Sequence, residues 1–225
     1  MRHYTGLIVS SNGQITVSSH SDSGIKRLLK IPFIYHHTQL IFGVYKVWKI
    51  ITDEYINPQE GMKILDIGSG TSGVLDYLHG FGVEYHGYDL NHNYVDSCSK
   101  KWCNKGKYYF FAKPVNEMSL SGTGEFDVVL AANLLHHLDD DEADRLVKIA
   151  FAVLKDSGKL ITCDPCLLDD MNCIEKLMAA HDRGRNIRTV PQYIALVKST
   201  FSRVSAHIRR VIRVPQRGLI MECIK

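Results

Sequence analysis

The chain has 225 residues, with 27 basic and 24 acidic side chains and a formal net charge of +3. This length accommodates one α/β domain, and 45% apolar content is typical of a globular protein. Such balanced charge does not favour nucleic-acid binding, and no apolar run reaches the ~20 residues that a membrane span requires. The first residues lack the apolar core of a secretion signal, so we expect a cytoplasmic protein.

Two segments precede the main domain. Residues 6–18 hold two β-rich runs around Asn12-Gly13, a pair that favours a tight turn, so residues 1–25 are predicted to form a hairpin-like extension. Residues 22–56 repeat apolar side chains at helical spacing, with an interruption at Pro32, and residues 26–60 are predicted to form a helical cap. Tyr35, within this cap, is a candidate to close one side of a ligand pocket.

From residue 62 onward, strand and helix patterns alternate. Strands are expected at 62–67, 83–89, 107–112, 126–132 and 159–163, and helices at 73–81, 93–103 and 140–154. Such alternation predicts a parallel sheet covered by helices on both faces. A helix is expected at 191–201, followed by strands at 204–211 and 218–223, whose short connection favours an antiparallel pair at the sheet edge.

The predicted fold class is therefore α/β. We expect residues 61–225 to form a doubly wound, mostly parallel seven-stranded sheet with an antiparallel last strand, helices on both faces and an N-terminal helical cap. Residues 165–190 fit neither a strand nor a simple crossover. They are predicted to be an insertion that caps the mouth of the sheet.

A glycine-rich loop, Asp66-Ile-Gly-Ser-Gly-Thr-Ser-Gly73, joins the first strand of this domain to its first helix. Glycine lets the backbone turn sharply and approach a ligand, and the start of the helix offers free N–H groups. Ligands of open α/β sheets bind at the carboxyl ends of the strands. The next strand ends at Asp89, whose carboxylate can accept hydrogen bonds from both hydroxyls of a ribose.

The loop also satisfies the dinucleotide pattern G-x-G-x-x-G, so an NAD(P)-dependent oxidoreductase stays an alternative. Asp66, two residues before Gly68, would repel a pyrophosphate but attract the amine and sulfonium of S-adenosylmethionine. There is no second domain to hold a hydride acceptor, and the only Tyr-x-x-x-Lys pair, Tyr45–Lys49, precedes the loop. We therefore expect S-adenosylmethionine to be the cofactor.

Three stretches carry a resemblance to a known family: residues 64–71, residues 126–138 and residues 155–162. In them the chain resembles class I, Rossmann-like S-adenosylmethionine-dependent methyltransferases, especially small bacterial ones, from about Ile31 to the C-terminus. It departs from the family where Ser69 replaces a frequent Cys and where Asp156 and Ser157 replace Pro and Gly. The cofactor-binding residues that the resemblance implies are Asp66, Gly68, Ser69, Gly70, Asp89, Leu90, Val115, Asn116 and Asn133.

Three further residues are candidates for catalysis. Methyl transfer from a sulfonium is an in-line displacement that depends on orientation, and a hydroxyl acceptor also benefits from a general base. His136, His137 and Asp164 are each expected near the carboxyl end of a strand. Packing of the histidines within their turn, and a turn role for Asp164 before Pro165, are the structural alternatives.

The predicted insertion contains Arg183, Arg185 and Arg188, which could bind a carboxylate or phosphate of the acceptor. The alternative is a polar loop in which Asp182 pairs with these arginines. The turn Asn133-Leu-Leu-His lacks the Asn/Asp-Pro-Pro-aromatic motif of enzymes that methylate base amino groups, which favours a small-molecule acceptor. A tRNA or rRNA methyltransferase and a non-catalytic cofactor-binding protein stay alternatives.

The six cysteines include one close pair, Cys163-x-x-Cys166. The other pair, Cys98 and Cys103, is expected on a different element, so a four-thiolate zinc site would require the two pairs to converge. A domain of this size needs no disulfides. We therefore expect reduced thiols and no bound metal.

Overall fold

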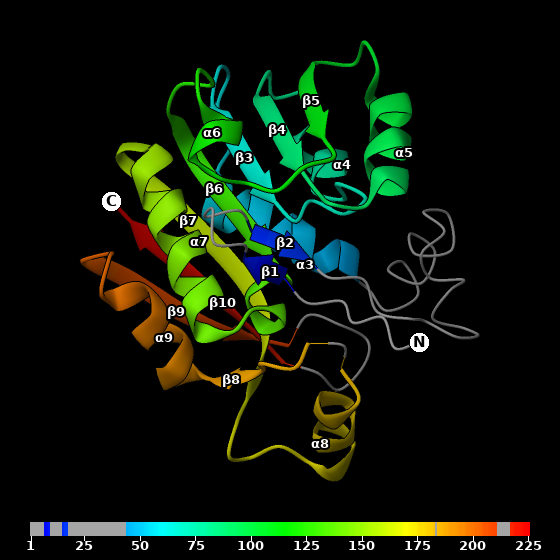
Figure 1. Ribbon diagram of the computed structural model, residues 1–225. Helices are drawn as coiled ribbons and strands as arrows, with labels where there is room; N and C mark the ends of the chain where they lie inside the picture. Colours follow the sequence, from blue (N-terminus) through cyan, green and yellow to red (C-terminus); the bar gives the residue numbers. More distant parts are fainter. Residues whose placement is uncertain (1–6, 10–14, 18–43, 183, 211–216) are drawn as a thin grey trace.

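The computed structural model describes residues 7–9, 15–17, 44–182, 184–210 and 217–225 (Figure 1). An eight-stranded sheet dominates the fold. Seven of its strands follow the order β5-β4-β3-β6-β7-β10-β9, and β8 pairs with β7 beside this path. The strands are β3 (Lys63–Ile67), β4 (Glu84–Tyr88), β5 (Lys107–Phe111), β6 (Phe126–Ala132), β7 (Leu154–Leu167), β8 (Arg188–Thr189), β9 (Arg203–Arg209) and β10 (Gly218–Ile224).

The direction of the strands follows the prediction. The pairs β3–β4, β4–β5, β3–β6 and β6–β7 are all parallel. The last strand, β10, runs antiparallel to both of its neighbours, β7 and β9. The carboxyl ends of β3, β4, β6 and β7 therefore meet at one edge of the sheet, where this type of fold binds its ligands.

Helices cover both faces of the sheet, as expected (Figure 1). One face packs against α6 (Glu117–Leu120), α7 (Asp140–Val153) and α9 (Val190–Lys198), and the other against α3 (Val44–Ile50), α4 (Leu75–Leu78) and α5 (His92–Trp102). Strand β6 serves both cores, because Val129 and Ala131 face the first and Val128 and Leu130 face the second. None of the helices described here is long and apolar enough to cross a bilayer.

Only parts of the N-terminal segment are among the described residues. Strands β1 (Leu7–Val9) and β2 (Ile15–Val17) form an antiparallel pair of their own, and the predicted turn at Asn12-Gly13 lies outside the described residues. Tyr35 and most of the predicted helical cap also lie outside them. Helix α3 continues into a π-helix, η1 (Ile51–Ile56), which ends at Asn57 with φ of +50°.

The predicted insertion contains an element that the sequence did not suggest, α8 (Cys173–Ala180). Asn172 caps this helix by accepting a hydrogen bond from the Glu175 amide at 2.9 Å. The Glu175 carboxylate accepts from Arg217 Nε at 3.0 Å, and Asp170 pairs with the same guanidinium at 2.7 Å. Helix α8 is thereby tied to the start of β10, below the sheet in Figure 1.

Two elements differ in extent from their predictions, and one further helix was not predicted. Helix α4 has 4 residues, because Ser72, with φ of +50°, and the residues around it form turns. Strand β7 extends over 14 residues, including Gly158 and Pro165, because β6 and β10 pair along most of its length. Helix α6, which was not predicted, begins at the cap residue Asn116.

Candidate functional site

The glycine loop leaves β3 and bends onto the end of β4. The amides of Gly68 and Ser69 both donate to the Tyr88 carbonyl, at 2.8 and 3.0 Å. Gly68 and Gly70 have φ of +72° and +53°, a region that glycine adopts without strain. A Cβ at Gly68 would lie 3.2 Å from Leu134 Cδ1, whereas one at Gly70 would meet no heavy atom of the described residues within 4 Å. Among these residues, Gly70 therefore borders open space.

Asp66 lies directly beneath this loop with 2% of its surface exposed. Tyr85 Oη donates a hydrogen bond to Asp66 Oδ2 at 2.5 Å. Burial raises the pKa of the Asp66 carboxyl to about 7, and this rise is opposed by the Tyr85 hydrogen bond and reinforced by the nearby charge of Asp89. A cation placed beside Asp66 would restore its charged form, so this carboxylate is suited to an ammonium or sulfonium ligand.

Asp89 follows β4 and lies at the same edge of the sheet. Its Oδ2 accepts from the Gly70 amide and its Oδ1 from the Asn91 amide, both at 2.8 Å. Burial raises the pKa of Asp89, and the hydrogen bonds from Asn91 and Gly70 oppose this rise. The two amides fix the carboxylate against the glycine loop, and each oxygen keeps acceptor capacity for a hydroxyl. Leu90, next in the chain, is half-buried.

Two of the predicted cofactor contacts lie after β5. Val115 is buried in the core. Asn116 caps α6, since its side chain accepts from the Ser119 amide at 2.7 Å and its own amide donates to Ser119 Oγ at 2.9 Å. Asn133 is exposed at the end of β6, with φ of +54°, and its amide donates to the Cys163 carbonyl at 2.7 Å. Their roles toward a cofactor stay predictions.

The two histidines lie on a short 3-10 helix, η2 (Leu135–His137), directly after β6. His136 is 4% exposed, and its Nδ1 lies 2.7 Å from Oδ1 of Asp164, the buried carboxylate in β7. The same Asp164 oxygen accepts from the His136 amide at 3.2 Å. The other carboxylate oxygen, Oδ2, is buried without a hydrogen-bond partner among the described residues. Asp164 thus fixes the His136 ring to the end of β7.

The insertion closes over the other side of His136. Asp182 Oδ1 lies 3.5 Å from His136 Nε2, and a Cβ at Gly184 would lie 2.0 Å from His136 Cδ2. Only glycine fits against the ring at this point. His136 is therefore enclosed between two carboxylates and the backbone, which suits a structural contact better than contact with an acceptor.

His137 lies beside it, half-buried, with 4.1 Å between the two ring centroids. Its amide donates to the Leu134 carbonyl at 3.0 Å, so the backbone of η2 fixes its position. Leu134 is also the residue that packs against Gly68. His137 is thus the more accessible histidine of this pair, on a turn whose Leu134 contacts the glycine loop.

The three predicted acceptor-binding arginines differ in their exposure and in whether the structure describes them. Arg183 lies outside the described residues, and Arg185 is exposed. Arg188 is 6% exposed and donates to Asp140 and to three backbone carbonyls. Arginines that look equivalent in the sequence therefore have different surroundings in the structure.

The cysteines are free thiols. Cys163 and Cys166 are buried, and burial raises the pKa of the Cys166 thiol to about 11 and that of Cys163 further. Neutral buried thiols are weak nucleophiles and poor metal ligands. Within the described part of the chain, no group of three or more metal-ligating side chains is placed to hold an ion.

Several residues of this site were not singled out from the sequence. Tyr85 binds Asp66, and Trp48 of α3 packs so close to the loop that a Cβ at Gly73 would lie 2.8 Å from its Nε1. Asp140 pairs with Arg188, whereas Asp182, predicted from the sequence as an alternative partner of the arginines, lies 3.5 Å from His136 Nε2. The only available signal was strand periodicity, which puts Tyr85 on one face of its strand but leaves the register with β3 undetermined.

Comparison with known proteins gives a consistent result. Residues 64–158 match the family model described as a methyltransferase domain. The chain is 26% identical over 179 residues to the phosphoethanolamine N-methyltransferase of Plasmodium falciparum, a match that covers 78% of this chain and 65% of that protein. The chain thus spans slightly less than two thirds of the length of this relative.

Solved structures share the fold at low identity. Phosphoethanolamine N-methyltransferase 2 of Haemonchus contortus, in complex with phosphomonomethylethanolamine and S-adenosylhomocysteine, has a TM-score of 0.69 at 13% identity, covering 94% of this chain and 62% of that one. Human N-acetylserotonin methyltransferase, in complex with S-adenosylmethionine, has a TM-score of 0.59 at 14% identity, covering 91% and 60%. The sheet order and the glycine loop agree with these matches: the chain has a Rossmann-like α/β fold, and residues 64–158 are similar to a methyltransferase domain.

Proposed function

We propose that this protein transfers the methyl group of S-adenosylmethionine to a small molecule that carries an anionic group. The observation that carries the proposal is the pair of carboxylates at the glycine loop. Asp66 is buried with a pKa raised to about 7, and Asp89 is held against Gly70. A buried carboxyl of this kind favours a cationic ligand, and the open space at Gly70 accommodates one.

The residues present fit this cofactor. Asp66 would bind its ammonium, Asp89 its ribose hydroxyls, and the backbone around Gly68 and Gly70 would line its path. When bound, the cofactor supplies a methyl group on a positively charged sulfur. The protein's own contribution is then to orient the acceptor and to remove its proton, because the donor is already activated.

His137 is the proposed proton acceptor. It is half-buried on η2, directly after Leu134, which contacts Gly68, and it is more accessible than the enclosed His136. Asp164 and His136 support it by fixing η2 to the end of β7. An amine or a hydroxyl acceptor would lose its proton to the His137 ring as the new bond to carbon forms.

The proposed acceptor carries a phosphate or a carboxylate, which Arg185 and Arg183 would bind. The two relatives named after phosphoethanolamine act, by name, on a small amine with a phosphate group. Arg185 is exposed on the insertion and directly follows Gly184, which packs on His136. This proximity to the histidine turn supports a role in holding the acceptor's anionic end.

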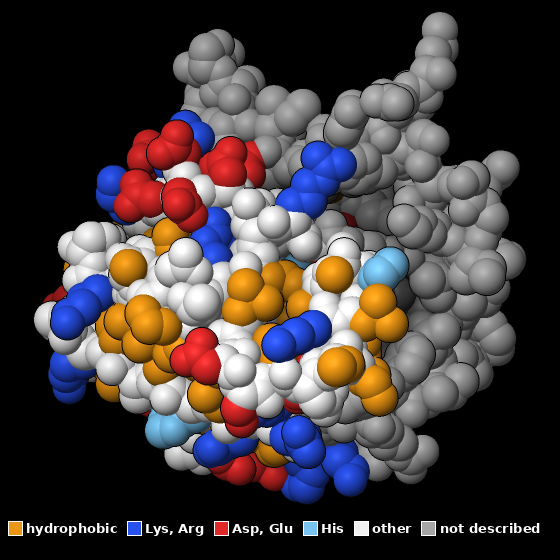
Figure 2. All heavy atoms as spheres, turned by 90° about the horizontal axis from the view of Figure 1, so that it is seen from below, with side chains coloured by type: hydrophobic (Ala, Val, Ile, Leu, Met, Phe, Trp, Pro, Cys, Tyr) orange, Lys and Arg blue, Asp and Glu red, His pale blue; other side chains and the backbone are white. Residues whose placement is uncertain are grey.

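A small acceptor is favoured over RNA by the surface charges. On the described part of the face in Figure 2, Lys and Arg side chains are interspersed with Asp and Glu. Among the C-terminal arginines, Arg209 pairs with Glu54, Arg210 with Glu175, and Arg217 with Asp170. These pairs reduce the positive potential that a polyanion would need.

We also propose a cytoplasmic location. All six cysteines are free thiols, a state that persists in reducing compartments. Several of these thiols are buried, so they stabilise the cores as small apolar groups.

The test is methyl transfer from radiolabelled S-adenosylmethionine to a matched pair of acceptors, phosphoethanolamine and ethanolamine. Transfer to phosphoethanolamine is expected to have a lower KM than transfer to ethanolamine. Arg185→Met should raise that KM about tenfold or more, because a charge-assisted bidentate contact is lost. Arg203→Met is the matched control, since Arg203 is exposed at the start of β9, at the opposite end of the sheet.

Three results would contradict the proposal. Equal transfer to both amines would mean that no anionic group is recognised. Binding of NADH without binding of S-adenosylmethionine, measured by calorimetry, would instead favour the oxidoreductase alternative. Cofactor binding with no transfer to any acceptor in a broad panel would favour a non-catalytic cofactor-binding protein.

A further inference from the structure

One short segment of the insertion binds the backbone of the histidine turn. The Asn186 amide donates to the His136 carbonyl at 3.0 Å. Arg188 donates to the Leu135 carbonyl at 2.9 Å and to the Leu138 carbonyl at 2.8 Å. Residues 186–188 thus satisfy three carbonyls of the turn that carries both histidines.

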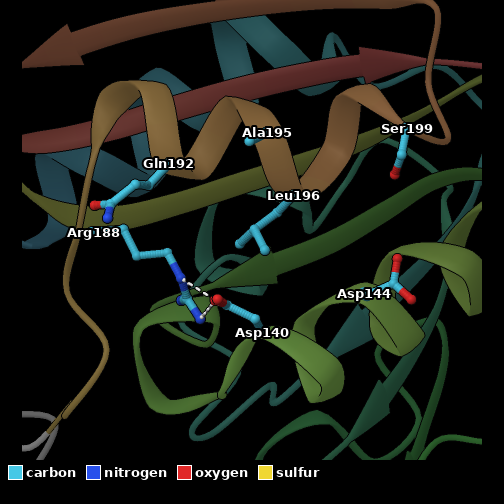
Figure 3. Close-up of a pocket in the computed structure, with 7 residues that line it drawn as sticks. All are labelled: Asp140, Asp144, Arg188, Gln192, Ala195, Leu196 and Ser199. Carbon is cyan, nitrogen blue, oxygen red and sulfur yellow. Dashed lines mark hydrogen bonds and ion pairs between the residues drawn. The ribbon is translucent and has the colours of Figure 1, made fainter.

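Arg188 is the centre of this contact, and its five N–H groups match the five hydrogen bonds that it donates. Besides Leu135 and Leu138, the guanidinium donates to the Asn186 carbonyl at 3.1 Å and twice to Asp140 Oδ1, from Nε at 3.0 Å and from Nη2 at 2.7 Å. Figure 3 shows the Arg188 side chain extended toward Asp140, the first residue of α7. The contact therefore joins the insertion to the turn and to α7.

The surroundings of Arg188 leave little capacity for an acceptor. Its side chain is 7% exposed, whereas that of Asp140 is 82% exposed. Its guanidinium carbon lies 5.9 Å from the centre of the Tyr193 ring, and the Tyr193 hydroxyl donates to the Pro165 carbonyl at 3.0 Å. Arg188 is thus fixed from several sides by protein groups.

We propose that Arg188 is a positioning residue that orients His137 through the backbone of η2. The proposal rests on the proposed function in one respect, that His137 takes the acceptor's proton. The planar guanidinium is required, because its two terminal nitrogens bind different carbonyls. Nη1 donates to the Leu135 carbonyl, just before the two histidines, and Nη2 donates to the Leu138 carbonyl, just after them. The Arg188→Lys variant cannot reproduce that geometry, since a lysine ammonium is a compact point charge without the fork.

The first test needs no turnover. In ¹⁵N-labelled protein, Arg188→Lys and Arg188→Met should shift the ring resonances of His136 and His137, which single His→Ala variants assign. The control, Arg203→Lys, should leave both unchanged. If both rings keep their resonances in a folded Arg188 variant, the positioning role is refuted, whether or not the protein methylates any acceptor.

The second test uses kinetics. Arg188→Lys should lower kcat by about 10- to 100-fold, the loss expected when a reacting group is misplaced, while the acceptor KM changes less than about twofold. Arg185 variants should show the opposite split, a raised acceptor KM. A raised acceptor KM with normal kcat in Arg188→Lys would overturn the proposal, because Arg188 would then bind the acceptor itself.

A double variant decides whether the effect passes through His137. In the His137→Ala background, Arg188→Lys should cause no further loss of kcat, since the group that it orients is gone. An undiminished loss in that background would refute the route through His137. Absence of transfer by the wild-type protein would instead count against the proposed function, and the resonance test would still judge Arg188.

Discussion

The raised pKa of Asp66 predicts how cofactor affinity depends on pH. In the empty protein its carboxyl titrates near pH 7, mainly because burial penalises the charged form. The cofactor's ammonium requires the carboxylate, so binding below pH 7 must first release a proton. Affinity for S-adenosylhomocysteine should therefore be about tenfold weaker at pH 6 than at pH 8 and about 100-fold weaker at pH 5, at 1.36 kcal/mol per pKa unit.

The sign for stability is opposite. In the unfolded chain Asp66 loses its proton near pH 4, whereas in the folded, empty protein it keeps it up to about pH 7. Between these values the folded state binds more protons, so its stability falls as pH rises. Asp66→Asn removes the free-energy cost of burying the ionised carboxylate, and the amide oxygen of the new side chain can still accept a hydrogen bond from Tyr85. At pH 8 the empty variant should be more stable by up to about 4 kcal/mol.

Isothermal titration calorimetry from pH 5 to 8.5 measures the binding arm, and urea unfolding measures the stability arm. The matched ligand is 5′-methylthioadenosine, which has the nucleoside but no amino-acid group. The pH dependence of its affinity should therefore reflect only titratable groups near the ribose, such as Asp89. If S-adenosylhomocysteine binds Asp66→Asn with the same pH dependence as wild type, the ammonium does not bind at Asp66 and the reasoning fails.

Three further substitutions test the loop and its surroundings. Asp89→Ala should weaken binding of S-adenosylhomocysteine and of 5′-methylthioadenosine alike by ~1–3 kcal/mol, and unchanged affinity in a folded variant would locate the ribose elsewhere. Gly68→Val should abolish cofactor binding in calorimetry, because its φ is +72° and its Cβ would lie 3.2 Å from Leu134; normal affinity would contradict this. Gly73→Ala should destabilise the protein by ~1–3 kcal/mol in urea unfolding, because its Cβ would lie 2.8 Å from Trp48 Nε1, and Trp48→Phe should recover part of that loss.

Much of the fold was predictable, because the signals are local. Strand β6 was predicted with its observed bounds, since its apolar run has no competing helical period. Strand β7 was predicted too short, because its ends contain Gly158 and Pro165, and only pairing with distant strands makes them part of the sheet. Helix α6 was missed because it has only 4 residues.

The glycine loop of the candidate site was likewise easier to predict than the proposed acceptor side, because its residues are close together in the sequence. Asp66, Gly68 and Gly70 lie within five consecutive residues, so the spacing in the sequence is already the spacing of a loop. The acceptor side is assembled from β6, β7 and the insertion, with contacts such as His136–Asp164 spanning 28 residues and Arg188–Leu135 spanning 53. Sequence patterns name the residue types there but not their partners.

The arginines of the insertion show why partners decide function. Arg185 and Arg188 are arginines three residues apart in the same insertion, yet one is exposed and the other, at the start of β8, donates five hydrogen bonds inside the protein. The difference lies in the partners: the Arg188 guanidinium reaches the Leu138 carbonyl and also the Leu135 carbonyl, which already accepts from the Leu138 amide at 3.2 Å. It follows that the insertion cannot vary freely to suit new acceptors. If the insertion binds the acceptor as proposed, its hydrogen bonds to the histidine turn would couple acceptor recognition to the placement of the proposed base.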